Sequence, residues 1–219
     1  MTVSAMAMAI VTEAGRATRR RLALVVARHH GRPGSPPGID PDRFALACLS
    51  DSYEVLADLV GVTSGIAGDA SDLEDLLWPG AVRLPAVSCQ ELVALAGTEF
   101  DELVLVPADV PDLPGLVVAK VFKALQRAEV CVAPERGGAG CAAIGISTPW
   151  PAWLSGDLDL DTNPVERLQA LAPSRTRVAV APSWHRMRTP DAIQRLDPGL
   201  EGWELTRSLL SGAPVSGEV

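Results

Sequence analysis

Hydrophobic and polar positions alternate in blocks along the chain, and these blocks predict strands separated by helices. Short apolar runs of strand length, rich in β-branched residues, cover positions 22–27, 103–106, 130–133, 141–146 and 177–181. Helical spacing covers 116–127, and a helix that begins at Pro41 places five residues on one face, namely Ala45, Leu49, Tyr53, Leu56 and Val60. Strands that alternate with helices indicate a mostly parallel central sheet with helices on both faces, and therefore an α/β fold.

Capping signals predict where further helices begin. Three pairs of residues have the spacing of a helix N-cap and its reciprocal carboxylate: Ser71 with Glu74, Ser88 with Glu91, and Asn163 with Glu166. Thr189 and Pro190 are predicted as the N-cap and first residue of another helix.

The length and composition favour one enzyme-sized domain. The chain has 219 residues, of which 47% are hydrophobic and 21% charged, enough to bury a sizeable single core. We expect a flexible N-terminal extension at 1–20, a single domain at 21–210 and a disordered tail at 211–219. The first apolar residues precede the arginines that follow them, the reverse of a secretory signal, and no apolar run approaches the roughly 18 residues of a membrane span. These features predict a soluble cytoplasmic protein.

The net charge indicates which kinds of binding partner are disfavoured. A net charge of -8 argues against nonspecific binding to nucleic acid or to an anionic membrane, since either needs a basic face. Local arginines can still bind a small phosphate ligand. The oligomeric state is not specified by the pattern.

Cysteines and tryptophans are interpreted as packing residues. The four cysteines show no metal-binding spacing and are expected to be buried free thiols: Cys48, Cys89, Cys131 and Cys141. The five tryptophans are expected to be core or lid aromatics rather than a base-stacking platform: Trp78, Trp150, Trp153, Trp184 and Trp203.

Two carboxylates follow the apolar run 103–106. Asp109 and Asp112 come just before Pro114, which opens a helical pattern. The carboxyl ends of strands in an open α/β sheet are where ligands bind, so Asp109 stands where a metal or substrate would be met. The alternative is that both aspartates only cap the next helix.

A glycine-rich loop joins the next two predicted strands. Gly137, Gly138 and Gly140 permit positive φ and a close approach of the backbone to a ligand. We expect at least one of Gly137 and Gly138 to adopt a backbone conformation that a Cβ would penalise.

The segments PADVPDL and APERGGAGCAAIGI resemble the GT-A-like nucleotidyltransferases. That superfamily includes the phospholactate guanylyltransferases, the molybdenum-cofactor guanylyltransferases and related bacterial glycosyltransferases of unknown substrate. The resemblance covers about residues 100–196, and more loosely the chain from Arg21. It implies a single-domain, Rossmann-like nucleotide-diphospho-sugar transferase (GT-A) fold. It also implies a transferase that acts on a nucleoside di- or triphosphate and a small phosphorylated or sugar acceptor.

The resemblance also implies roles for individual residues. Asp109 matches the metal-binding aspartate, which would hold Mg²⁺, and Asp112 matches a less uniform acidic position. Gly137 and Gly138 match the loop that approaches the substrate.

Two segments depart from the pattern of that superfamily. The basic pair that grips phosphates after the first strand is missing, although Arg28 and Arg32 supply cations in a Pro/Gly-rich loop. Arg186 and Arg188 stand where the D-x-D-T-P motif has its acidic residues. Replacing a ligating carboxylate by a cation reverses the local charge, which weakens a divalent metal site.

Three hypotheses remain open. In the first, Asp109 holds one cation of an active transferase and Arg186, Arg188, Arg28 or Arg32 hold phosphates. In the second, the chain is a catalytically inactive paralogue that binds a phosphorylated ligand or a protein partner in a regulatory role. The third, a purely structural domain, has no positive feature behind it. The first two share the expectation that Asp109 and Arg188 lie at one edge of the sheet.

Overall fold

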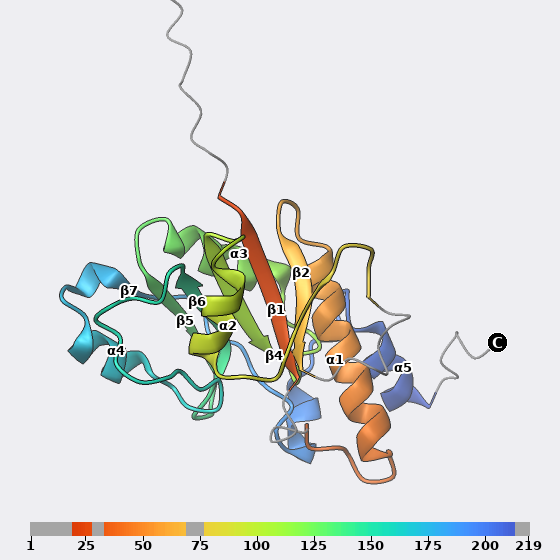
Figure 1. The fold of residues 1–219 in the computed structure, drawn as a ribbon. Helices are drawn as coiled ribbons and strands as arrows, with labels where there is room; N and C mark the ends of the chain where they lie inside the picture. Colours follow the sequence, from red (N-terminus) through yellow and green to blue (C-terminus); the bar gives the residue numbers. More distant parts are fainter. Residues whose placement is uncertain (1–18, 28–32, 69–76, 213–219) are drawn as a thin grey trace, which may run out of the picture.

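The computed structural model describes residues 19–27, 33–68 and 77–212. They form one seven-stranded sheet and the helices that pack on it (Figure 1). Most of the predicted N-terminal extension, the tail from 213, and Arg28 and Arg32 lie outside the described residues.

The sheet is mixed but mostly parallel. Its strands are β1 (Arg21–Ala27), β2 (Thr63–Gly68), β3 (Val82–Leu84), β4 (Glu102–Pro107), β5 (Val130–Pro134), β6 (Cys141–Ser147) and β7 (Val178–Val180). Their spatial order is β3-β2-β1-β4-β6-β5-β7, and only β6 runs antiparallel to its neighbours β4 and β5. The predicted α/β fold with a mostly parallel sheet is therefore confirmed. The parallel pairing of Val26 with Pro107 brings the carboxyl ends of β1 and β4 to the same edge.

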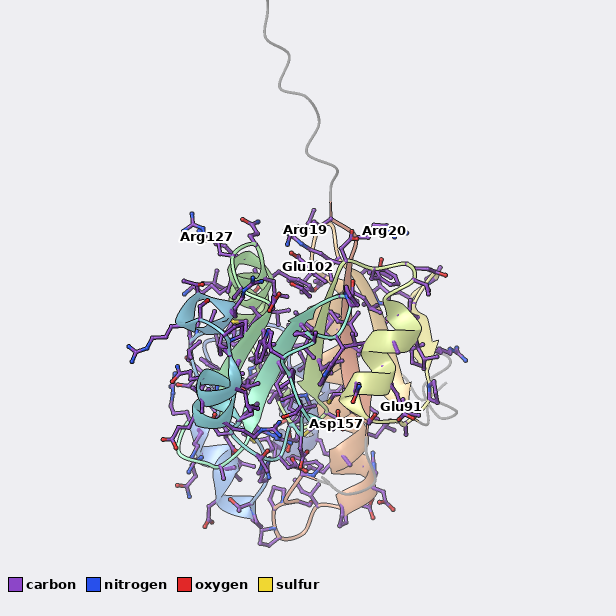
Figure 2. The ribbon with its side chains drawn as sticks, turned by 60° about the vertical axis from the view of Figure 1, so that its left-hand side comes forward. Arg19, Arg20, Glu91, Glu102, Arg127 and Asp157 are labelled. Carbon is purple, nitrogen blue, oxygen red and sulfur yellow. The ribbon has the colours of Figure 1, made fainter. Side chains whose placement is uncertain are left out.

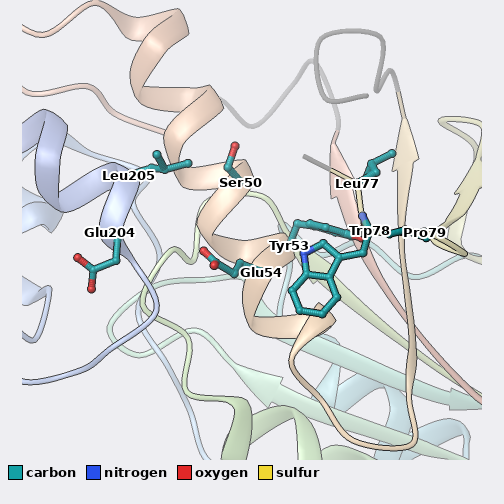
Figure 3. A pocket seen from close by; sticks show the side chains of 8 residues that line it. All are labelled: Ser50, Tyr53, Glu54, Leu77, Trp78, Pro79, Glu204 and Leu205. Carbon is teal, nitrogen blue, oxygen red and sulfur yellow. Dashed lines mark hydrogen bonds between the residues drawn. The ribbon is translucent and has the colours of Figure 1, made fainter. Parts of the chain in front are cut away.

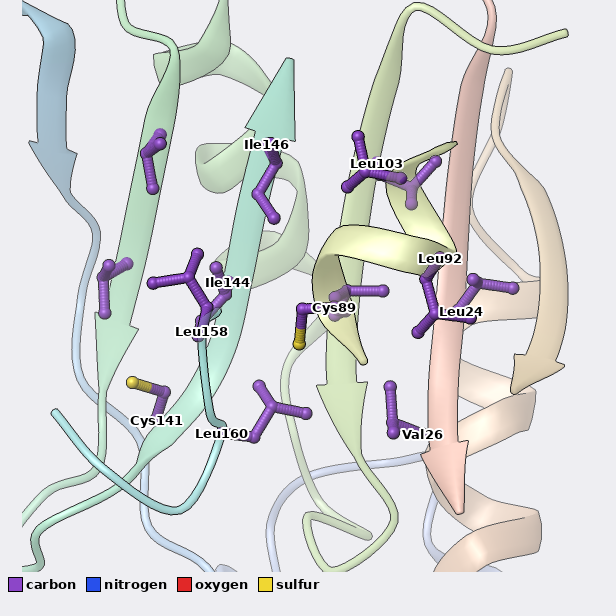
Figure 4. Packing of buried hydrophobic residues seen from close by; sticks show 14 of the residues in the cluster. Leu24, Val26, Cys89, Leu92, Leu103, Cys141, Ile144, Ile146, Leu158 and Leu160 are labelled. Atoms are coloured by element: carbon purple, nitrogen blue, oxygen red, sulfur yellow. The ribbon is translucent and has the colours of Figure 1, made fainter. Parts of the chain in front are cut away.

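Helices cover both faces, as predicted. They are α1 (Pro41–Ala57), α2 (Cys89–Ala96), α3 (Gly115–Leu125), α4 (Val165–Leu171) and α5 (Glu204–Ser211), with 3₁₀ helices η2 (Arg175–Arg177) and η3 (Pro190–Arg195). Because side chains alternate along a strand, Leu24 of β1 packs with Leu92 of α2 on one face, while Val25 packs with Tyr53 and the helices α1 and α3 on the other. Figure 4 shows the first of these two clusters.

Helix α1 is buried on a second side by the C-terminal part of the chain. Phe44 and Cys48 of α1 pack with Trp203, which immediately precedes α5, and with Met187. Asp51 of α1 accepts hydrogen bonds from the backbone N–H groups of Leu205 and Thr206 in α5. These contacts dock α5 against α1.

Ion pairs lie at the amino edge of the sheet, where β1 and β4 begin. Glu102 at the start of β4 is fully buried, and its carboxylate accepts hydrogen bonds from Arg19 at 2.6 Å and Arg21 at 3.0 Å. Figure 2 shows Arg19 and Glu102 together at this edge. The paired guanidinium groups offset the cost of burying the carboxylate.

Some predicted helix details are corrected. Ser88 and Glu91 form the expected capping box of α2. Asn163 is not the N-cap of α4: Pro164 occupies that position, and the Asn163 side chain accepts a hydrogen bond from the N–H of Val165 instead. The predicted start at Ser71 lies outside the described residues.

One further prediction about helices is wrong in part. Helix α1 ends at Ala57, so Val60 falls in the turn beyond it and is 99% exposed instead of sharing the buried face. Thr189 is the N-cap of η3 and Pro190 its first residue, as predicted, although η3 is a 3₁₀ helix and the Thr189 side chain makes no capping hydrogen bond. The four cysteines are buried free thiols, as expected. Among the described helices, none has the length and apolar character that crossing a bilayer requires.

Candidate functional site

The site lies at the carboxyl end of β4. Every residue of β4 is buried, and the chain then turns through Asp109 and Asp112 before α3 begins. The backbone carbonyl of Asp109 accepts a hydrogen bond from the N–H of Met187 at 2.8 Å. This bond fixes the segment that follows β7 against the end of β4, and it brings the side chain of Arg186 to Asp109.

Arg186 and Asp109 form a buried bidentate ion pair. The Arg186 Nε donates to Asp109 Oδ1 at 2.7 Å, and Nη2 donates to Oδ2 at 3.0 Å. The exposed fraction is 3% for Arg186 and 1% for Asp109. The remaining nitrogen, Nη1, donates to the carbonyl of Leu160 at 2.7 Å and lies 3.1 Å from Asp161 Oδ1. The guanidinium group is thus surrounded by acceptors from the protein itself.

Burial and charge act in opposite directions on this pair. Burial raises the pKa of the Asp109 carboxyl, and the charge and hydrogen bonds of Arg186 oppose that rise. Burial also disfavours the charged form of Arg186, but the carboxylates of Asp109, Asp161 and Glu135 together raise its pKa above the ordinary value. The guanidinium therefore stays charged, and it is the counter-ion of Asp109.

Arg188 extends the pair into a network. Its Nη2 donates to Asp161 Oδ1 at 2.6 Å, and its Nε lies 3.2 Å from Glu135 Oε2. Asp161 also contacts Arg186, so Asp109 and Arg188 lie in one cluster, which confirms the expectation that they share an edge of the sheet. We call these five residues the ion-pair network: Asp109, Glu135, Asp161, Arg186 and Arg188. Carboxylates outnumber guanidinium groups in it by one.

The glycine loop makes room for this network. Gly137 has φ +75°, which confirms the expectation that at least one of Gly137 and Gly138 adopts a conformation that a Cβ would penalise. A Cβ at Gly138 would lie 2.2 Å from the carboxylate carbon of Glu135, and one at Gly140 would lie 2.4 Å from Arg188 Nη2. Two of the three glycines are therefore explained by the close approach of charged side chains to the loop. The substrate-binding role of Gly137 and Gly138 stays a prediction.

Asp112 is engaged separately. Its Oδ1 accepts a hydrogen bond from the indole of Trp184 at 3.1 Å, and its Oδ2 lies 3.0 Å from Nε2 of the buried His185. The backbone N–H of Asp197 donates to the same Oδ2 at 3.3 Å. The rings of Trp184 and His185 stack with centroids 4.8 Å apart. Asp112 thus ties the start of α3 to the segment that carries the two arginines.

The residues present do not fit the magnesium ion that the resemblance implies. Mg²⁺ requires oxygen ligands in near-octahedral geometry, whereas both oxygens of Asp109 accept from Arg186 and both oxygens of Asp112 contact other protein donors. In the part of the chain that the structure describes, no group of three or more His, Cys, Asp or Glu side chains is arranged to hold a metal ion.

The sequence motifs did not single out three residues of this region. Glu135 stands two residues before Gly137, and Asp161 is the last of three aspartates at alternate positions. Arg195 is exposed, and its guanidinium lies 3.9 Å from the position that a Cβ at Gly137 would take. No motif or spacing in the sequence singles out Arg195. It lies near the glycine loop because of the position of η3 in the fold.

Comparison with known proteins gives a result for the fold only. No family model and no curated protein sequence matches the chain. A proposed nucleotide-diphospho-sugar transferase from Desulfovibrio desulfuricans G20 matches with a TM-score of 0.60 and 19% identity, over 90% of this chain and 99% of that one. The 4-diphosphocytidyl-2C-methyl-D-erythritol synthase of Anaerococcus prevotii DSM 20548 matches with a TM-score of 0.53 and 10% identity, over 81% and 96%.

The 2-C-methyl-D-erythritol 4-phosphate cytidylyltransferase of Thermus thermophilus matches with a TM-score of 0.50 and 16% identity, over 86% of this chain and 99% of that one. The chain therefore has the GT-A-like fold of nucleotide-diphospho-sugar transferases and cytidylyltransferases, as its motifs predict. At these identities the likeness establishes fold and not activity.

Proposed function

We propose that the protein binds a phosphorylated small molecule, a nucleoside di- or triphosphate or a close derivative, at the carboxyl edge of the sheet without a divalent cation. It is then a catalytically inactive relative of the nucleotidyl- and glycosyltransferases, with a regulatory role. The observation that carries this proposal is the bidentate pair of Arg186 with Asp109.

The ion pair occupies the carboxylate that a metal-assisted transfer would need to bind its metal ion. A catalytic divalent ion bridges phosphate oxygens and stabilises the leaving group, so it must bind the carboxylate and the ligand at once. Arg186 satisfies Asp109 but is itself buried, and its Nη1 donates to the carbonyl of Leu160. The guanidinium therefore neutralises Asp109 without being presented to a ligand.

Two other arginines reach solvent and could contact phosphate, although Arg188 also pairs with Asp161 and Glu135. The side chain of Arg188 is 33% exposed, and Arg195 is exposed next to Gly137. Guanidinium groups bind phosphate oxygens through paired N–H donors, and no metal is needed for that contact. Arg28 and Arg32 follow β1 in the sequence and are further candidates for the same contact, although they lie outside the described residues.

Calorimetric titration with ATP, GTP, CTP and UTP, each in magnesium and in EDTA, tests the proposal. We expect at least one nucleotide to bind with the same dissociation constant in both buffers and to weaken with added salt. Arg188→Ala and Arg195→Ala should each weaken binding about tenfold, the loss of one charge-assisted hydrogen bond. Arg127→Ala is the matched control, because Arg127 is an exposed arginine at the opposite edge (Figure 2).

Two results would overturn the proposal. One is that none of the four nucleotides binds in either buffer. The other is that binding needs magnesium and is lost in Asp109→Asn, a substitution that keeps the shape of the side chain paired with Arg186.

An active, metal-dependent transferase is the second candidate, and the fold likeness favours it. Arg186 would then have to leave Asp109 when metal and substrate enter. Release of pyrophosphate or nucleoside diphosphate in magnesium, abolished by Asp109→Asn, would establish it. The double variant Arg186→Asp, Arg188→Asp probes the same scaffold: a gain of magnesium dependence would show that the sheet edge still has the geometry of a metal site.

A further inference from the structure

A cavity lies away from the ion-pair network, between α1, the segment at 77–79 and the start of α5 (Figure 3). Its volume is about 570 Å³, within the usual range for pockets that hold a small organic molecule. None of the residues of the ion-pair network lines it. Its chemistry is set by two aromatic residues, Tyr53 and Trp78, and two carboxylates, Glu54 and Glu204.

The aromatic wall is held rigidly but left open. The buried Tyr53 hydroxyl accepts a hydrogen bond from the backbone N–H of Trp78 at 3.0 Å and lies 3.4 Å from the hydroxyl of Ser64. The first of these bonds ties the backbone of Trp78 to Tyr53 of α1. The Trp78 side chain is nevertheless 50% exposed, and Figure 3 shows its indole in the pocket beside Tyr53. An indole face in this position can receive a ligand without rearrangement of the chain.

The charged wall is entirely negative. Glu54 is exposed, and its carboxylate makes no hydrogen bond or ion pair with the part of the chain that the structure describes. Glu204 is 63% exposed, and within the described ranges its ion-pair partner is Arg207 of its own helix, at 3.5 Å. Among the described residues that line the cavity there is no lysine, arginine or histidine. The site therefore disfavours phosphates and favours a cation.

We propose that this cavity binds a small molecule that carries a guanidinium group. The flat cation would stack on the indole of Trp78, and its N–H donors would meet the carboxylates of Glu54 and Glu204. A guanidinium fits better than an ammonium because it is planar, weakly hydrated and able to stack and donate hydrogen bonds at once. The net charge of -8 adds a favourable long-range field for such a ligand.

Calorimetric titration of the full chain with arginine amide, lysine amide and citrulline amide tests this site. Citrulline amide has nearly the shape of arginine amide but no charge on its side chain. We expect saturable binding of arginine amide, weaker binding of lysine amide and none of citrulline amide. Trp78→Leu and Glu54→Gln should each weaken arginine amide about tenfold, since each removes one charge-directed contact.

Controls separate binding from folding. Glu166→Gln makes the same substitution at an exposed glutamate of α4, and it should leave the affinity unchanged. Trp78 and Glu54 are not core side chains, so both variants should unfold at the wild-type temperature. Equal binding of arginine and citrulline amides, or wild-type affinity in Glu54→Gln, would overturn the proposal. Nucleotide binding at the sheet edge does not enter this result, so the two proposals fail independently.

Discussion

The guanidinium of Arg186 binds both carboxylate oxygens of Asp109, at 2.7 and 3.0 Å, and neither side chain is open to solvent. An arginine thus lies where the motif resemblance implies a metal ion, and its segment is held by the backbone hydrogen bond between Met187 and Asp109. Arg186, which stands at an acidic position of the motif, therefore forms an internal ion pair in the fold.

Removing one partner of this pair should be costly. Arg186→Met keeps an unbranched side chain but leaves Asp109 buried without a counter-charge. We expect a loss of about 3 to 5 kcal/mol in the free energy of unfolding, measured by urea denaturation. Removing both charges in Arg186→Met, Asp109→Leu should restore most of the loss, since an apolar pair leaves no unpaired charge at these two positions.

Arg177→Met serves as the control for that measurement. Arg177 pairs with Glu129 at 2.6 Å, but both side chains are partly exposed, so its loss should cost less than about 1 kcal/mol. Similar costs for Arg177→Met and Arg186→Met would mean that the Asp109 pair is not a buried structural ion pair.

Asp112 should prove to be a structural anchor. Asp112→Ala leaves the indole N–H of Trp184 and the backbone N–H of Asp197 without their acceptor, and removes the partner of His185. We expect a loss of roughly 2 to 4 kcal/mol, with a changed near-ultraviolet circular dichroism from Trp184. Asp191→Ala, an exposed position in η3, is the matched control. A variant Asp112→Ala with wild-type stability and spectrum would contradict this role.

Much of the sheet could be predicted from the sequence, and the reason lies in its burial. Strands β1, β4, β5 and β6 are covered on both faces, so each is a continuous apolar run that stands out in the pattern. Strand β2, with the sequence TSGIAG, and the three-residue β3 have too little apolar character to stand out. Helix α5 was missed because its docking depends on Asp51, a contact distant in sequence.

The site was predictable only in part for a similar reason. Asp109 follows a buried strand, and Arg186 and Arg188 occupy motif positions, so local sequence identifies all three. Their mutual contacts depend on the crossing of segments far apart in the chain. Asp161 and Glu135 complete the network through such crossings, which no local pattern could show.

We expect that position 138 requires glycine because the Glu135 carboxylate leaves no room for a Cβ there. The three atoms closest to a Cβ at Gly138 all belong to the Glu135 carboxylate, at 2.2, 2.4 and 2.5 Å. We expect Gly138→Ala to cost about 1 to 3 kcal/mol in the wild type by overpacking, and almost nothing in the Glu135→Ala background, where the space is vacated. Urea denaturation of the four proteins measures this coupling. The same cost in both backgrounds would show that backbone conformation, and not the carboxylate, requires the glycine.

Docking of α5 should depend on pH through Asp51. This carboxyl is fully buried, and burial raises its pKa from 3.8 to about 6, although the hydrogen bonds from Thr206 and Leu205 oppose the rise. Because the folded state then holds the proton more tightly than the unfolded state, the free energy of unfolding falls as the pH rises through the window between those two values. The total change should be on the order of 3 kcal/mol.

The measurement is the difference in unfolding free energy between wild type and Asp51→Asn at pH 4, 5, 6 and 7, since the other titrating groups cancel in that difference. The asparagine side chain of the variant has no proton to release, so the wild type should lose stability relative to the variant as the pH rises. Asp58→Asn, an exposed position just after α1, tests whether the slope belongs to Asp51. A slope of the opposite sign would mean that the two N–H groups at the start of α5 stabilise the ionised carboxylate by more than burial disfavours it.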